Sequence, residues 1–315
     1  MFTIQTAVTI VTAGLASSLF GITENMVVWS LIITIMCYII LLLGKYQILD
    51  KMIKVIILIL AISTIFSTGV ASINTDEIYS FKQMFPSGSG LVFLVAFMGW
   101  MPAPLDISIW HSIWTLEKKK SQKITAKESL FDFNVGYLAT VILGICFVSL
   151  GALVMYNSGI SFSNSGSIFA GQLIDLYTSN LGDSFYLIIS ICAFTTMLST
   201  TITCLDASPR TMSRATQLLT KNNDKNYYFH WISALAIGTM LIFYFLLSEM
   251  GALVELATVL SFITAPFYAI LNYKLIMSDN MPKSHKPSKN LRILSIIGIF
   301  FLSFFALGYI LTRFI

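Results

Sequence analysis

The chain has 315 residues, of which 56% are apolar and only 11% are charged, and its mean hydropathy is +0.81. A soluble domain carries about 25% charged residues, so this composition excludes an ordinary soluble protein. The formal net charge of +4 is explained below by membrane topology, and no nucleic-acid partner is expected. We predict an all-α polytopic protein that is surrounded by a lipid bilayer.

Nine stretches of the chain are long and apolar enough to span a bilayer, which takes about 20 residues each. We expect them to form a single transmembrane domain, residues 1–315. The first stretch is rich in Thr, Ala and Gly and is the weakest; it lacks the basic n-region of a signal peptide. The predicted spans are 3–22, 26–43, 52–72, 90–115, 133–155, 183–204, 228–248, 251–274 and 291–312.

The basic residues alternate between the two sides of these spans. Of the 19 Lys and Arg residues, all but Lys82 and Arg313 lie in the loops that follow spans two, four, six and eight. Loops rich in Lys and Arg stay in the cytoplasm. We therefore expect an integral protein of the plasma (inner) membrane, with a cytoplasmic N-terminus and an external C-terminus.

The segment from Gly88 to Thr115 is the first place to look for a site. It is long enough to span, yet Pro102 and Pro104 interrupt its middle. Proline removes a backbone donor and clashes with the preceding turn, so these residues predict a broken helix. In hydrocarbon such a break is tolerated only where it is buried in protein or lines a wet cavity.

Two side chains beside the break are candidates for a functional site. The thioether of Met101 suits a soft transition metal, although methionine is also a common core residue and the chain has 14. A carboxylate deep in a span, here Asp106, costs about 2.5 to 3.5 kcal/mol and usually marks a functional site. Its other interpretation is a cap for the helix that restarts after the break.

Other polar groups are weaker candidates. His111 follows five residues after Asp106 and either relays protons or bonds to a neighbouring carbonyl. Asp132 stands at the entry of the fifth span, and Asp206 follows the hydroxyl-rich end of the sixth. The tryptophans of this region, Trp100, Trp110 and Trp114, are expected to pack or to mark the membrane interface.

No enzyme motif occurs in the chain. The sequence has no G-x-G-x-x-G, Walker sequence, nucleophile elbow or H-E-x-x-H. We therefore expect no enzymatic activity and no resident cofactor. The four cysteines lie within spans without metal-ligand spacing and are predicted to be apolar fillers: Cys37, Cys146, Cys192 and Cys204.

The order of several motifs resembles the Nramp family of proton-coupled divalent metal transporters. These motifs are GKYQILDKMIKV, the VFL stretch with Met101-Pro102 and His111-Ser112, the entry at Asp132, AFTTMLSTTITC, and ELATVLSF. They cover nearly the whole chain in the order of the family's third to eleventh helices. No single motif decides the resemblance; their shared order carries it.

The resemblance implies a LeuT-type inverted repeat in which two broken helices meet at mid-membrane. Carried over, Met101 is the thioether ligand and Met98 the carbonyl donor for a divalent metal ion, which is the substrate. The family's Asp-Pro-Gly-Asn motif is absent from this chain, so the fold is expected to be a partial one. Ala103 and Ala257 also stand where the family has histidine and glutamine.

These departures leave three functions to compare. The first is a secondary transporter of manganese or iron type, with Met98, Met101 and Asp106 at the metal and His111, Asp132 and Asp206 as proton or path groups. The second is a carrier of another small solute with the same fold. The third is a non-transporting subunit or fragment that assembles with a partner chain. That partner would supply the family's first two helices, which this chain is expected to lack.

Overall fold

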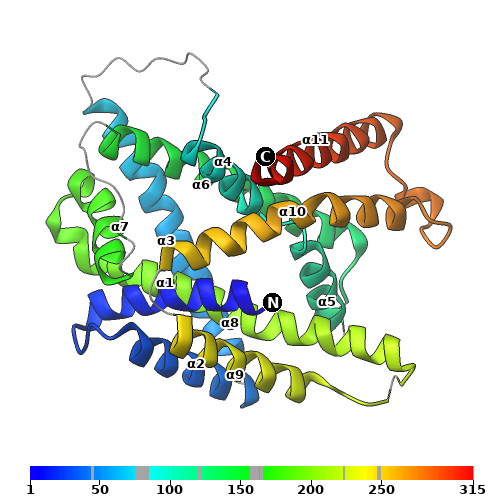
Figure 1. Ribbon diagram of the computed structural model, residues 1–315, viewed down its shortest axis with the longest axis horizontal. Coiled ribbons are helices and arrows are strands. Elements are labelled where there is room, and N and C mark those ends of the chain that lie inside the picture. Colours follow the sequence, from blue (N-terminus) through cyan, green and yellow to red (C-terminus); the bar gives the residue numbers. More distant parts are fainter. Residues whose placement is uncertain are drawn as a thin grey trace. The chain divides into compact units, whose positions relative to one another are not determined.

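The computed structural model describes residues 1–43, 46–74, 85–101, 103–119, 123–156, 163, 166–222, 224–246 and 250–314. Within these ranges the regular structure is entirely helical, as predicted (Figure 1). A π-helical turn, Gly151–Met155, extends α6. The helices are α1 Phe2–Phe20, α2 Met26–Leu42, α3 Tyr46–Ile73, α4 Ser89–Trp100, α5 Ile107–Lys119, α6 Ala126–Leu150, α7 Gly166–Leu181, α8 Tyr186–Thr220, α9 Tyr228–Leu246, α10 Met250–Met277 and α11 Lys289–Phe314.

Seven stretches within the described helices are long and apolar enough to cross a membrane: Phe2–Phe20, Lys54–Ile73, Ala126–Met155, Asp183–Thr220, Tyr228–Phe245, Gly251–Met277 and Lys289–Leu311. Two further apolar helices are shorter, at Met26–Leu42 and Gly90–Trp100. All nine predicted spans therefore correspond to helices, and the stretch 90–115 is divided between α4 and α5. This division confirms the predicted break.

The chain divides into two compact units. Unit 1 comprises Met1–Phe81 and Ile113–Val254, and unit 2 comprises Lys82–Ser112 and Glu255–Ile315. The two units are described separately below.

Helix α1 lies at the centre of unit 1, where it packs against α2, α7, α8 and α9. It is the predicted span that looked weakest, yet most of its residues are buried. Its threonines, alanines and glycine allow neighbouring helices to approach closely, which explains the burial. Thr12 Oγ1 and Thr201 Oγ1 of α8 are hydrogen-bonded at 2.8 Å, and Gln5 Nε2 donates to Thr9 Oγ1 at 3.1 Å.

Helix α8 does not end near residue 204, where the sixth span was predicted to end. It continues through Pro209 to Thr220 because its last turns pack against the start of α9. The amide of Tyr227 donates to Ser213 Oγ at 3.2 Å, and Trp231 Nε1 donates to Thr216 Oγ1 at 2.9 Å. These contacts offset the backbone hydrogen bond that Pro209 cannot make.

Residues 166–182 have an amphipathic pattern and form α7, whose apolar face is buried in unit 1. Ala170, Ile174 and Tyr177 pack against Leu15 of α1 and Ile189 of α8. The amphipathic pattern therefore marks a helix that covers the core of unit 1.

Candidate metal site at the helix break

Helix α4 ends at Trp100 because the chain turns to an extended conformation at Met101, with φ −107° and ψ 128°. The last helical bond runs from the amide of Met101 to the carbonyl of Phe97, at 2.9 Å. Pro102 lies outside the described residues, but as a proline it has no N–H to donate to the carbonyl of Met98 four residues earlier. The final carbonyls of α4 thus lack helical donors.

Helix α10 fixes the end of α4 within unit 2. A Cβ added to Gly99 would overlap the carbonyl oxygen of Thr258, so only glycine permits this approach. Trp100 Nε1 donates to Ser261 Oγ at 3.1 Å. Met98 packs beside Phe262, which is fully buried. The thioether of Met98 therefore serves packing, whereas its carbonyl belongs to the last turn of α4.

The same helix contacts the chain beyond the break. Asn272 Nδ2 donates to Ser108 Oγ at 3.0 Å, and the Ser108 hydroxyl lies 2.8 Å from the carbonyl of Leu105. Asp106 precedes the first residue of α5, is partly buried and interacts electrostatically with Tyr268. Helix α10 therefore bridges the two halves of the interrupted helix.

Four of the six predicted site residues lie together in unit 2. Met98 and Met101 precede the break, Asp106 follows it, and His111 lies in α5. All four are partly buried, and His111 makes interactions with its surroundings. The break thus gathers one thioether, one carboxylate and the last carbonyls of α4.

Asp206 lies in unit 1, at the centre of a polar cluster. Both of its carboxylate oxygens accept hydrogen bonds from Arg210 Nε, each at 2.8 Å. The Tyr228 hydroxyl donates to Oδ1 at 2.7 Å, and Trp114 Nε1 donates to Oδ2 at 3.3 Å. Arg210 also lies 4.0 Å from Glu117 and stacks on the Tyr228 ring. Through these contacts Asp206 joins α5, α8 and α9.

Asp132 is placed differently from the other candidates. It lies on α6 in unit 1, and its side chain is exposed, like every side chain from 130 to 140. No group of three or more His, Cys, Asp or Glu residues that could hold a metal occurs in the part of the chain that the structure describes. Any metal at the break would thus depend on Met101, Asp106 and backbone carbonyls.

The sequence analysis missed the residues of α10 that face the break. Ser261, Tyr268 and Asn272 are polar residues in an apolar span, and their spacing places them on one helical face. That pattern is readable in the sequence, because a polar face on a spanning helix usually faces protein or a cavity. The pattern does not reveal which helix this face contacts.

The family model described as "Natural resistance-associated macrophage protein-like", or Nramp, matches residues 1–312. The chain belongs to the Nramp family. Together with the seven membrane-spanning helices, this membership makes it an integral membrane protein. The family assignment also supports the non-enzymatic character expected from the sequence.

The chain is also similar to a curated protein. It is an uncharacterized protein, PM0681, of Pasteurella multocida (strain Pm70), 34% identical over 278 residues. The match covers 86% of this chain but 63% of the relative. The chain therefore spans less than two thirds of the length of this relative.

Proposed function

We propose that this protein is part of a secondary transporter of divalent metal cations of the manganese and iron type, working by alternating access. The observation that supports this most is the interrupted helix, because Met101 and Asp106 flank a break in a spanning segment of an Nramp-family chain. A thioether favours softer metals, and a carboxylate and carbonyls supply oxygen ligands. The metal is the cargo, and no resident cofactor is needed.

In this proposal each residue at the break has a separate role. Met101 binds the metal through sulfur, and the selectivity against magnesium and calcium comes from that atom. Asp106 contributes charge and one or two oxygens, and the carbonyl of Met98 contributes another. Packing of Gly99 and Trp100 on α10 keeps the donors of α4 in position.

For proton coupling we favour His111 over the two aspartates. His111 lies in the same unit as the break, and histidine side chains commonly act as proton shuttles. Asp206 accepts hydrogen bonds from Arg210, Tyr228 and Trp114. Releasing it for proton transfer would break these contacts between α5, α8 and α9. Asp132 is exposed on α6 and is better placed for contact with another segment or for the path of the ion.

We further propose that a segment beyond this chain completes the metal site. The break offers few ligands, and the chain spans 63% of its relative. Residues 130–140 of α6 are exposed on all sides and include Asp132 and Asn134, whose polar groups are costly in hydrocarbon. A partner segment packed against this part of α6 would shield them. The basic loops support a plasma (inner) membrane location with a cytoplasmic N-terminus.

The test is metal uptake into proteoliposomes that hold this chain, alone and after co-expression with the part of the relative that this chain does not match. We expect saturable manganese uptake in the second preparation, reduced at least about tenfold by Met101→Ala, since a lost ligand costs 1.4 kcal/mol or more. Met281→Ala, which lies outside the spans, is the matched control. A proton gradient should accelerate uptake, and His111→Gln should remove that acceleration.

Three results would decide against the proposal. Equal manganese uptake by the wild type and by Met101→Ala would show that the Met101 thioether does not bind the metal. Uptake of another small solute, without metal, would favour the second function considered above. No uptake by well-folded protein in either preparation would leave a non-transporting subunit, which the partial coverage of the relative favours as the second candidate.

A further inference from the structure

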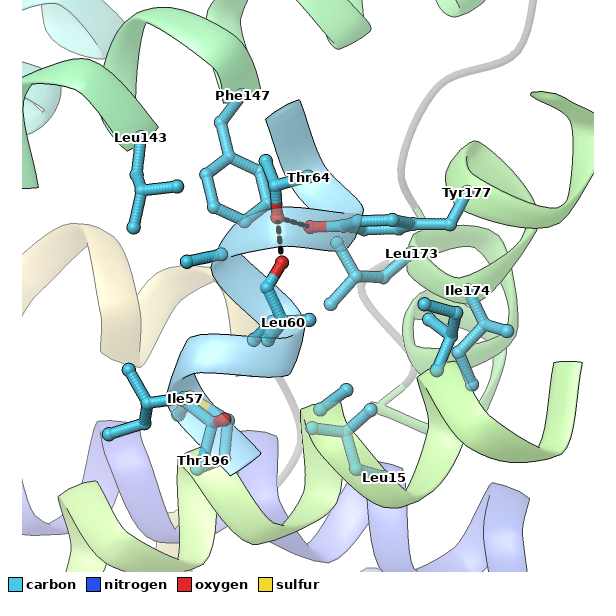
Figure 2. A pocket seen from close by; sticks show the side chains of 14 residues that line it. Leu15, Ile57, Leu60, Thr64, Leu143, Phe147, Leu173, Ile174, Tyr177 and Thr196 are labelled. Carbon is cyan, nitrogen blue, oxygen red and sulfur yellow. Dashed lines mark hydrogen bonds between the residues drawn. The ribbon is translucent and has the colours of Figure 1, made fainter. Parts of the chain in front are cut away.

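Unit 1 contains an apolar cavity of about 300 Å³ between α1, α3, α6, α7 and α8 (Figure 2). Aliphatic and aromatic side chains from all five helices form its wall. Leu15, Leu143 and Ile174 are among them. All of its wall residues belong to unit 1, and the proposed transport function does not use it.

The cavity wall has few polar groups that could bond to a ligand. Thr64 Oγ1 donates to the carbonyl of Leu60 at 2.7 Å, so the Tyr177 hydroxyl, 3.0 Å away, is the donor to Thr64. Figure 2 shows both bonds at the edge of the cavity. Thr196 Oγ1 is buried without a hydrogen-bond partner among the described residues. Apart from this hydroxyl, the wall presents hydrocarbon.

The size of the cavity exceeds that of a packing defect. Protein interiors leave few voids larger than one water molecule. A cavity of about 150 Å³ lined by Leu, Ile and Phe stays dry and takes up benzene. The cavity of unit 1 has about twice that volume and a similar lining. An apolar molecule therefore fits it better than water.

Two residues of the cavity wall are exposed on unit 1. Ile57 of α3 and Phe147 of α6 line the cavity and are also exposed, at 42% and 41%. Both lie within the stretches Lys54–Ile73 and Ala126–Met155, which are long and apolar enough to cross a membrane. On a spanning helix an exposed apolar side chain meets acyl chains, because the bilayer core holds no other solvent.

We propose that this cavity binds one acyl chain of a bilayer phospholipid, which enters between α3 and α6 while its headgroup stays at the membrane surface. The chain would fill the space between α1 and α8 on one side and α3 and α6 on the other. Its binding would make the stability of unit 1 depend on lipid chain length. The proposal does not rest on metal transport.

The test uses the full chain in nanodiscs that contain phosphatidylcholine with a photoactivatable diazirine in the middle of one acyl chain. After irradiation, adducts are mapped by peptide mass spectrometry. We expect adducts on wall residues of at least two helices, such as Leu143 and Ile174. Adducts confined to lipid-facing residues outside the cavity, such as Leu58 and Ile62, would overturn the proposal.

Filling the cavity should remove the wall adducts. Ala61 on α3 and Ala193 on α8 line the cavity, so Ala61→Phe and the milder Ala193→Leu occupy the space of the chain. We expect the wall adducts to fall at least about fivefold, because the site is blocked by steric overlap. Ile62→Phe, at the neighbouring exposed position, should leave them unchanged. Thermal melting of each variant in the same nanodiscs verifies folding, and unchanged wall adducts in both folded filling variants would overturn the proposal.

Two further arms separate the ligand sources. Thr196→Val keeps the shape of the side chain and removes its hydroxyl, so an acyl chain should bind as before. Loss of the adducts in this variant would point to a polar ligand and contradict the proposal. A free fatty acid that carries the same diazirine should label the wall less than the phospholipid; labelling by the free acid alone would also contradict it.

Discussion

The polar groups of α1 and α8 in unit 1 join helices, whereas those of α10 in unit 2 contact an interrupted helix. In unit 1 the hydroxyl and amide groups of α1 bond to one another and to α8, and Asp206 is held by three side chains. In unit 2 the polar side chains of α10 bond to the segments before and after the helix break. The last carbonyls of α4 at this break have no helical donors. Satisfied polar groups join helices, whereas an interrupted backbone leaves atoms for a ligand. The comparison explains why the candidate metal site lies in unit 2.

The largest expected effect concerns the polar cluster of unit 1. Asp206→Ala should lower the free energy of unfolding by about 3 kcal/mol, because Arg210 loses its nearest carboxylate and Tyr228 and Trp114 lose their acceptor. Thermal unfolding in detergent measures this loss. Asp224→Ala, in an exposed turn, is the control and should change little. Equal melting temperatures for the two variants would contradict a structural role for the cluster.

A smaller effect is expected at the closest helix approach of unit 2. Gly99→Val should cost about 2 kcal/mol, since a side chain there meets the backbone of Thr258 and α4 must shift from α10. The control is Gly69→Ala, where nothing lies within 4 Å of the added carbon. That change should be neutral or slightly stabilising in the same melting experiment. Equal melting temperatures for the two variants would contradict the close approach of α4 to α10 at Gly99.

The hydrogen bond beside the break should contribute less. Trp100→Phe removes the donor to Ser261 while keeping an aromatic ring, and about 1 kcal/mol should be lost. Adding Ser261→Ala to this variant should lower the free energy of unfolding only a little further, since the hydrogen bond is already absent. Additive losses in the double variant would show that the two side chains do not interact.

The smallest expected effect lies in the centre of unit 1. A double-mutant cycle of Thr12→Val and Thr201→Val should give a coupling energy of about 0.6 kcal/mol, typical of hydroxyl pairs between membrane helices. Melting of the wild type, both single variants and the double variant supplies the four values. A coupling of zero would mean that these hydroxyls are satisfied separately.

The sequence predicted the local features of the fold well. Apolar runs indicated the helices, and Pro102 with Pro104 indicated the break between α4 and α5, because both signals depend only on neighbouring residues. The central place of α1 was missed, since small residues lower hydropathy while favouring close packing. The end of α8 was missed because contacts with α9 outweigh Pro209.

The candidate site was predicted only in part. Met101 and Asp106 were found because they adjoin the break, and Asp206 because it is charged within an apolar region. The bonds of Asp206 to Tyr228 and Trp114 join residues 22 and 92 positions apart. The approach of Asn272 to Ser108 crosses 164 positions. Such pairings depend on tertiary packing, which spacing along the chain does not encode.

The length of α8 has a practical consequence for imaging. Its 35 residues measure about 52 Å at about 1.5 Å per residue, while the hydrocarbon core is about 30 Å thick. Several turns of α8, the long yellow-green helix in Figure 1, therefore extend beyond the lipid. Because Ser213 and Thr216 bond these turns to the start of α9, the α8–α9 hairpin forms a stiff stem. For a membrane protein of 35.0 kDa, that stem is a suitable graft point for a fiducial domain in electron cryomicroscopy.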